Sequence, residues 1–164
     1  MIRSFKLFKI LSKVGQKKCK SITPTGIGGA TVTIKSSVEI ITEWDIVAAR
    51  QLGRDEAKAL GFDTVDQARI TTAISELARN IYLYARIGVI EIEKFETDTE
   101  KKIIVIATDQ GPGIEDIRKV MEDGYSTSGG LGAGLPGVNR LMDNMVIQSV
   151  MGEGTTIRAE KWLR

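Results

Sequence analysis

The feature that constrains the fold most is a short, almost uninterrupted apolar segment that ends in a carboxylate and a glycine turn. Residues 102–108 are apolar except at their two ends, and a strand of this composition belongs in the middle of a sheet. Asp109 follows at once, and Gly111 and Gly113 then force a turn. The apolar core of the segment, residues 103–107, is far shorter than the roughly 18 residues that cross a membrane, so we expect no firm membrane association.

The rest of the chain alternates between helical and strand patterns. Apolar residues recur at helical spacing from Thr42, a helix cap, to about Leu60, and again from Asp63 to about Arg86. Strands are expected at residues 36–42, with a start near Val32 as the alternative, and at 89–95, 146–150 and 155–162. Two shorter helices are expected near 114–121 and 135–144. This alternation predicts an α/β domain.

The charge is unevenly divided along the chain. Residues 1–38 carry eight basic and no acidic side chains, whereas residues 39–164 carry 15 basic and 21 acidic ones, a net charge of −6. A net acidic folded part argues against nucleic-acid binding. We expect residues 1–35 to be an unstructured basic extension and residues 36–164 to be the folded domain. The alternative for the extension is a basic helix on a membrane surface.

Cysteine and histidine usage narrows the chemistry. The single cysteine, Cys19, allows neither a disulfide nor a cysteine metal cluster within one chain. That composition fits a reducing compartment, and we expect a cytoplasmic protein. Because the chain has no histidine, it has no histidine base, no histidine metal ligand and no phosphohistidine of its own.

Two polar residues stand one turn apart on the second long helix. Glu76 and Asn80 lie on a face rotated by about 90° from its apolar stripe, at the edge of the core. An asparagine oxygen is a hard neutral ligand for Mg²⁺, and a nearby carboxylate can accept a proton from an attacking hydroxyl. The alternative is a solvated helix face, in which Glu76 pairs with Arg69 or Arg79.

A strand-end carboxylate and a glycine-rich segment are two further features that suit a nucleotide site. Asp109 can accept a hydrogen bond from an adenine amino group, and glycines let a flat base approach the backbone. The alternative for this segment is an ordinary turn. Residues 129–137 carry five glycines, whose backbone amides can bind phosphate oxygens, although a flexible loop would look the same. Together these features predict a nucleotide site.

Four motifs occur in the order typical of the GHKL (Bergerat) ATPase family, which this chain resembles. They are Glu76-x-x-x-Asn80, Asp109-x-Gly111-x-Gly113, Gly130-x-Gly132-x-Gly134 and Gly152-x-Gly154-Thr155. Within that family, residues 42–53, 74–84 and 126–137 are similar to the stressosome switch serine/threonine kinases of the anti-sigma-factor kinase branch. The resemblance extends from about Val38 to Arg164.

This resemblance implies a two-layer sandwich, with helices packed on one face of a mixed β-sheet, and an ATP-binding serine/threonine protein kinase. Asn80 would hold Mg²⁺ together with the ATP phosphates, and Glu76 would be the candidate catalytic base. Asp109 would bind adenine, supported by Thr155. The remaining cofactor-binding residues would be the glycines that shape the pocket, Gly111, Gly113, Gly130, Gly132 and Gly134.

The resemblance also implies partners. The expected substrate is a STAS-domain scaffold or antagonist protein, and the expected second partner is a PPM-type serine phosphatase that the released kinase activates. Phosphorylation would add roughly −1.5 to −2 charge to the scaffold and expel the kinase, a partner-switching signal in bacterial stress response. The alternatives are an anti-sigma factor of the same fold, a detached histidine-kinase catalytic domain, and an ATP-sensing adaptor without phosphotransfer.

A basic stripe marks the first long helix. Arg50, Arg54 and Lys58 recur every four residues, roughly opposite its apolar positions. We expect Arg50 and Arg54 to dock an acidic patch on a partner, because a guanidinium forms paired bonds with carboxylates. The alternative is a solvated face on which these cations pair with nearby acids such as Asp55.

Overall fold

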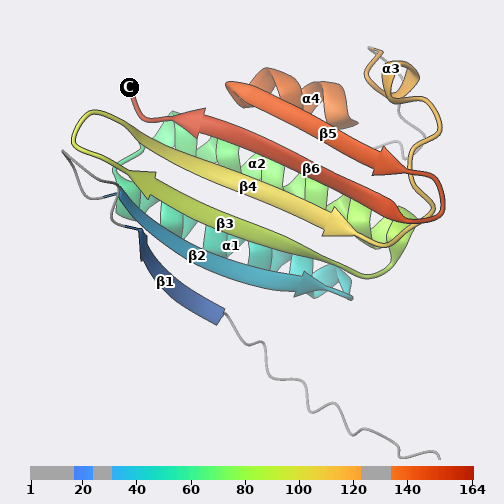
Figure 1. Ribbon diagram of the computed structural model, residues 1–164, viewed down its shortest axis with the longest axis horizontal. Helices are drawn as coiled ribbons and strands as arrows, with labels where there is room; N and C mark the ends of the chain where they lie inside the picture. The colour runs from blue at the N-terminus through green and yellow to red at the C-terminus, as the bar shows by residue number, and fades with distance from the viewer. Residues whose placement is uncertain (1–16, 24–30, 123–133) are drawn as a thin grey trace, which may run out of the picture.

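The computed structural model describes residues 17–23, 31–122 and 134–164, and six strands form one sheet in the order β1-β2-β3-β4-β6-β5 (Figure 1). The strands are β1 (Lys17–Thr23), β2 (Thr31–Ile40), β3 (Gly88–Glu96), β4 (Lys101–Asp109), β5 (Asn144–Val150) and β6 (Gly154–Trp162). The helices are α1 (Glu43–Leu60), α2 (Thr64–Asn80), the π-helical η1 (Ile81–Ala85), α3 (Ile117–Val120) and α4 (Gly134–Leu141). Helices α1, α2 and α4 lie on one face of the sheet, which confirms the expected two-layer α/β sandwich.

The sheet differs from the expectation in one respect, because its neighbouring strands are antiparallel in every described pair rather than mixed. Strands β4 and β5 run in the same direction and are connected through α4. Strand β6 turns back from β5 and lies between the two. A connection that would otherwise have created a parallel pair therefore leaves only antiparallel neighbours.

Helix α1 begins and ends as its sequence signals predict. The carboxylate of Asp45 accepts hydrogen bonds from the backbone N–H of Thr42 (2.7 Å) and from its hydroxyl (2.9 Å), which satisfies a donor at the helix start. Gly61 ends the helix in the left-handed region with φ 104°. Between these caps the helix buries Ala49, Leu52 and Ala57 against the core.

The second long helix changes its geometry after Asn80, although the sequence predicted one helix to about Arg86. The backbone N–H of Arg86 donates to the Ile81 carbonyl (2.8 Å), five residues earlier, so the last turn is π-helical. Arg86 itself adopts φ 68°. This wider turn keeps Ile81 in the core while Tyr84 and Ala85 reach the wall of a cavity described below.

The expected start of the domain at residue 36 is too late, because β2 begins at Thr31 and pairs with β1. Val32 lies opposite Glu96 of β3, and Ile34 lies opposite Lys94. The sequence signal was weak because this alternation is short and adjoins a glycine-rich segment. The expectation that residues 1–16 and 24–30 are unstructured falls outside the described residues.

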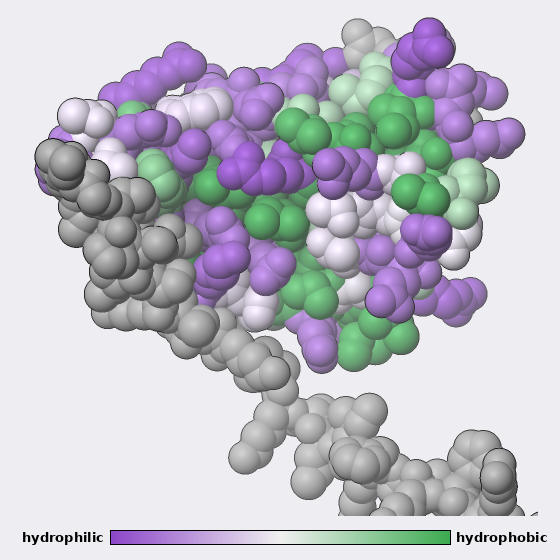
Figure 2. Space-filling model, viewed as in Figure 1, coloured by the Kyte–Doolittle hydropathy of each residue, from purple (hydrophilic) through white to green (hydrophobic). Residues whose placement is uncertain are grey.

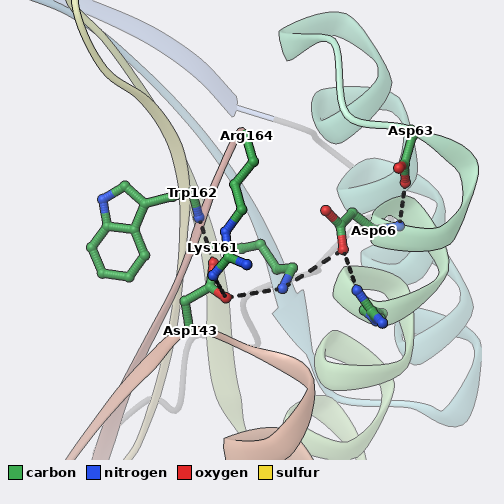
Figure 3. Close-up of polar contacts among 7 residues, drawn as sticks. Asp63, Asp66, Asp143, Lys161, Trp162 and Arg164 are labelled. Atoms are coloured by element: carbon green, nitrogen blue, oxygen red, sulfur yellow. Dashed lines mark hydrogen bonds and ion pairs between the residues drawn. The ribbon is translucent and has the colours of Figure 1, made fainter.

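A network of ion pairs and hydrogen bonds connects β6 to α2 (Figure 3). The amine of Lys161 lies 3.2 Å from an Asp143 oxygen and 3.6 Å from an Asp66 oxygen. The other Asp143 oxygen accepts a hydrogen bond from the backbone N–H of Trp162 (2.9 Å). Burial alone would raise the pKa of Asp143, but this bond and the charges of Lys161 and Arg164 outweigh it and lower the pKa.

The opposite face of the sheet carries no helix within the described residues. Figure 2 shows apolar and polar residues intermixed on this face, without a single continuous apolar surface. Among the described residues, no helix is both long enough and apolar enough to pass through a bilayer.

Candidate functional site

A cavity of about 400 Å³ opens where α2 and β4 end. It collects side chains from segments far apart in the chain. Its wall is formed by Asn80, Tyr84, Ala85, Asp109, Pro112, Gly113, Ile114, Glu115, Asp116, Lys119, Val120, Gly134, Leu135, Thr155 and Ile157. The fold therefore brings together five residues that the sequence predicted for a nucleotide site: Asn80, Asp109, Gly113, Gly134 and Thr155.

Asp109 is the last residue of β4 and lies opposite Thr155 of β6. One of its carboxylate oxygens, Oδ1, accepts a hydrogen bond from the backbone N–H of Gly111 (2.8 Å). Within the described residues, the second oxygen receives no hydrogen bond. One oxygen thus fixes the side chain, while the other can accept a hydrogen bond from a ligand in the cavity.

Thr155 is buried, with 8% of its surface exposed, and is held by a serine that the sequence did not indicate. Its hydroxyl lies 2.8 Å from Ser149 Oγ, and Ser149 Oγ also accepts from the backbone N–H of Ile114 (2.8 Å). Ser149 therefore connects β5, β6 and the segment after the glycine turn. The alternation of β5 puts Ser149 on the less exposed side of the strand, which is the one sequence signal that could have found it.

The two glycines of the turn, Gly111 and Gly113, are required for different structural reasons. Gly113 adopts φ 80°, and a Cβ there would lie 2.5 Å from the Val150 carbonyl oxygen. Gly111 is not part of the cavity wall; a Cβ there would lie 2.7 Å from the Cβ of Ala85 in η1. Gly111 thus lets the Asp109 turn pack directly against η1, whereas Gly113 belongs to the wall itself.

Asn80 and Glu76 do not share the same position relative to the cavity. Asn80, the last residue of α2, is half-buried and belongs to the wall. Glu76, one turn earlier, is also half-buried but is not part of the described wall. The suggested pairing of Glu76 with Arg69 is replaced by an ion pair between Arg69 and Asp66 (2.9 Å).

Lys119 is a cation in the wall that the sequence analysis missed. It lies on α3, whose first turn is capped by Asp116, since Oδ1 of Asp116 accepts from the backbone N–H groups of Arg118 (3.0 Å) and Lys119 (3.2 Å). The other charged residues in the described wall are the carboxylates Asp109, Glu115 and Asp116. A four-residue helix has no periodic signal, so only the fold reveals that Lys119 faces this cavity.

Three predicted glycine positions fall in or beside the part of the chain that the structure leaves out. Gly130 and Gly132 lie outside the described residues, whereas Gly134 begins α4 with φ 59°. Arg50 and Arg54 are exposed on α1 and do not belong to the cavity wall. The site and the basic stripe are therefore separate surfaces.

Comparison with known proteins assigns the class. Residues 65–164 match the family described as histidine kinase-, DNA gyrase B-, and HSP90-like ATPase. The chain belongs to this ATPase family, which confirms the resemblance inferred from its four motifs, and membership implies ATP binding.

Three individual proteins illustrate what this chain is similar to within the family. The chain is 72% identical over 130 residues to the serine/threonine-protein kinase RsbT of Bacillus subtilis (strain 168), an alignment covering 79% of this chain and 98% of RsbT. It is 34% identical over 102 residues to the anti-sigma F factor of Caldanaerobacter subterraneus subsp. tengcongensis, covering 58% of this chain and 70% of that protein. The anti-sigma F factor of Clostridium botulinum (strain Eklund 17B / Type B) is 36% identical over 106 residues, covering 60% and 73%.

Proposed function

We propose that this chain is an ATP-dependent serine/threonine protein kinase that acts as a partner-switching signal in the bacterial stress response. The observation that carries the proposal is the Asp109 carboxylate, held by Gly111 through one oxygen and placed with Thr155 in the wall of the cavity. The 72% identity to a protein named as a serine/threonine kinase supports the same activity.

In this proposal the adenine amino group donates to the second oxygen of Asp109. The hydroxyl of Thr155, positioned by Ser149, would support the base directly or through a water. The backbone at Gly113 would lie against the flat ring, because Gly113 belongs to the cavity wall. The remaining apolar wall, including Ile114 and Ile157, would exclude water from the base.

The described residues fit Mg²⁺ only if ATP phosphates and waters supply most of its ligands. No group of three or more cysteine or acidic side chains suited to a metal ion occurs among the residues that the structure describes. Mg²⁺ takes its ligands largely from waters and substrate phosphates, so a single amide oxygen from Asn80 is sufficient. When bound, Mg²⁺ neutralises charge that develops during phosphoryl transfer.

Glu76 remains the proposed catalytic base. It lies one helical turn from Asn80, and residues four apart on a helix are about 5–6 Å apart at Cβ. From there its carboxylate would accept the proton of a serine or threonine hydroxyl that enters beside the ATP phosphates. Since Glu76 lies outside the described wall, this role requires the phosphoacceptor to approach from the α2 side.

The proposed phosphoacceptor is a STAS-domain scaffold or antagonist protein, and the proposed second partner is a PPM-type serine phosphatase, with both encounters in the cytoplasm. Arg50 and Arg54, exposed on α1, would contact acidic groups on these partners. The relatives named anti-sigma F factors favour a second candidate, an anti-sigma factor of the same fold whose main output is sigma-factor binding.

The test is transfer of labelled γ-phosphate from ATP to a purified STAS-domain protein. We expect the wild-type chain to label a serine or threonine, and Asp109→Asn to need far more ATP. The matched control is Asp98→Asn, an exposed carboxylate away from the cavity, which should behave as wild type. Tight binding of a sigma subunit without any labelling would instead support the anti-sigma candidate.

A further inference from the structure

The two tryptophans of the chain have contrasting environments. The indole N–H of Trp162 donates to a Glu100 oxygen (2.8 Å), and the Lys102 amine lies 5.4 Å from the centre of the Trp162 ring. Trp44, in the first turn of α1, is 81% exposed. Exposed aromatic anchors are the side chains that most often dominate binding at protein interfaces. Trp162 is only partly exposed and is held by these polar contacts within the fold, whereas no such contact holds Trp44 among the described residues.

Trp44 is one of four exposed apolar residues at the start of α1 and at the adjoining end of the β2–β3 ladder. Ile40 and Gly88 form the last pair of the β2–β3 ladder, so Ile41 and Ile87 are the next residue on each strand, and α1 begins two residues after Ile41. Ile41 is 50% exposed and Ile87 63%. Val47 follows Trp44 on the next turn of α1 and is 51% exposed. We name these four residues, Ile41, Trp44, Val47 and Ile87, the Trp44 patch.

The Trp44 patch continues toward the nucleotide cavity. Ile87 follows η1, whose Leu83 and Tyr84 are both about half exposed. Tyr84 and its neighbour Ala85 belong to the cavity wall. A partner seated on the patch would therefore stand beside the cavity from which a phosphoryl group must be transferred.

Charges at the edge of the patch indicate the chemistry of its occupant. Arg50 lies one turn beyond Val47 on α1, and Arg86 precedes Ile87; both are exposed. The nearest exposed carboxylate on α1 is Glu43, beside Trp44. A partner surface that is apolar at its centre and carries carboxylates opposite the two arginines would match this arrangement.

We propose that the Trp44 patch is the docking surface for the protein that receives the phosphoryl group. The assignment rests on the proposed kinase function, because it takes the adjoining cavity as the phosphoryl donor site. A second copy of this chain is a poorer fit, since it would bring the same arginines to the contact. An anionic lipid surface would match the arginines and the indole, but it has no reason to adjoin the cavity.

The first test separates docking from chemistry. Trp44→Ala should raise the KM for a purified STAS-domain phosphoacceptor at least tenfold, while the KM for ATP and kcat stay at wild-type values. Trp44→Phe should retain most of the affinity. The matched control is Val65→Ala, because Val65 is 56% exposed in the first turn of α2, at the end opposite Asn80. An unchanged KM with Trp44→Ala in a chain that does transfer phosphate overturns the docking surface.

The second test needs no catalysis. In a Trp162→Phe variant, Trp44 is the only tryptophan, so its emission should shift to shorter wavelength when the STAS-domain protein is added. A shift without phosphoryl transfer by the wild-type chain would reject the kinase proposal and retain the docking surface. No shift at saturating partner would overturn the docking surface. So would a shift seen only with phosphatidylglycerol vesicles, or one that depends on the concentration of this chain alone.

Discussion

Replacement of Lys119 by alanine tests whether the cavity is built for a phosphorylated ligand. Lys119 is the cation among the described wall residues, where the other charged side chains are carboxylates. Removing a hydrogen bond to a charged group costs about 1.5–3 kcal/mol, equivalent to about a 10- to 150-fold loss of affinity. A bare Coulomb estimate at 4 Å and an effective dielectric of 20 gives about 4 kcal/mol, which solvent screening reduces toward the same range.

The assay is isothermal titration calorimetry with a series of nucleotides. Lys119→Ala should lower the affinity for ATP and for ADP about 10- to 150-fold. It should leave the affinity for adenosine unchanged, because adenosine has no phosphate. Lys119→Arg should keep most of the affinity. Arg118→Ala is the matched control, since Arg118 is the exposed neighbour on α3 and is not in the wall. Equal losses for ATP and adenosine, or no loss for ATP, would refute the reasoning.

Three substitutions and two deletions test other parts of the structure. Asn80→Ala should abolish the Mg²⁺ dependence of ATP binding measured by calorimetry, whereas Glu76→Gln should keep ATP binding and lose phosphoryl transfer in a labelling assay, because an amide accepts no proton; transfer at the wild-type rate would remove Glu76 as the base. The pKa of Asp143 is lowered in the folded state, so its stabilising effect is complete above the unfolded pKa of about 3.9 and is lost as pH falls through the folded-state pKa. Asp143→Asn should therefore lower the free energy of unfolding at pH 7 by about 1 kcal/mol and flatten the loss of stability below about pH 4 in denaturant titrations; an unchanged acid profile would contradict this. Deletion of residues 1–16 should leave the unfolding midpoint and ATP affinity unchanged, whereas deletion of residues 1–35 removes β1 and the first half of β2 and should lower the midpoint in a thermal melt; equal midpoints would mean that these strands contribute nothing to stability.

Local signals predicted the parts of the fold that depend on neighbouring residues. The capping pair of Thr42 and Asp45 fixed the start of α1, and Gly61 marked its end. The apolar segment before Asp109 predicted β4, which ends at that residue. These predictions succeeded because caps, turns and periodicity act over a few residues.

Features that depend on contacts between distant segments were not predictable in the same way. The antiparallel pairing of β4 with β6 depends on how β6 inserts between two strands. Lys119 and Ser149 join the site only because α3 and β5 pack beside Asp109 and Thr155. The exposure of Trp44 follows from the position of α1 relative to the sheet, which helical periodicity does not determine.

The most direct test of the account is a crystal structure of the chain with Mg²⁺ and a non-hydrolysable ATP analogue. The account predicts the adenine amino nitrogen within hydrogen-bonding distance of the Asp109 carboxylate, the ring against Gly113, and Asn80 in the coordination sphere of Mg²⁺. A nucleotide bound outside the cavity, or an adenine whose amino group faces away from Asp109, would contradict the central claim.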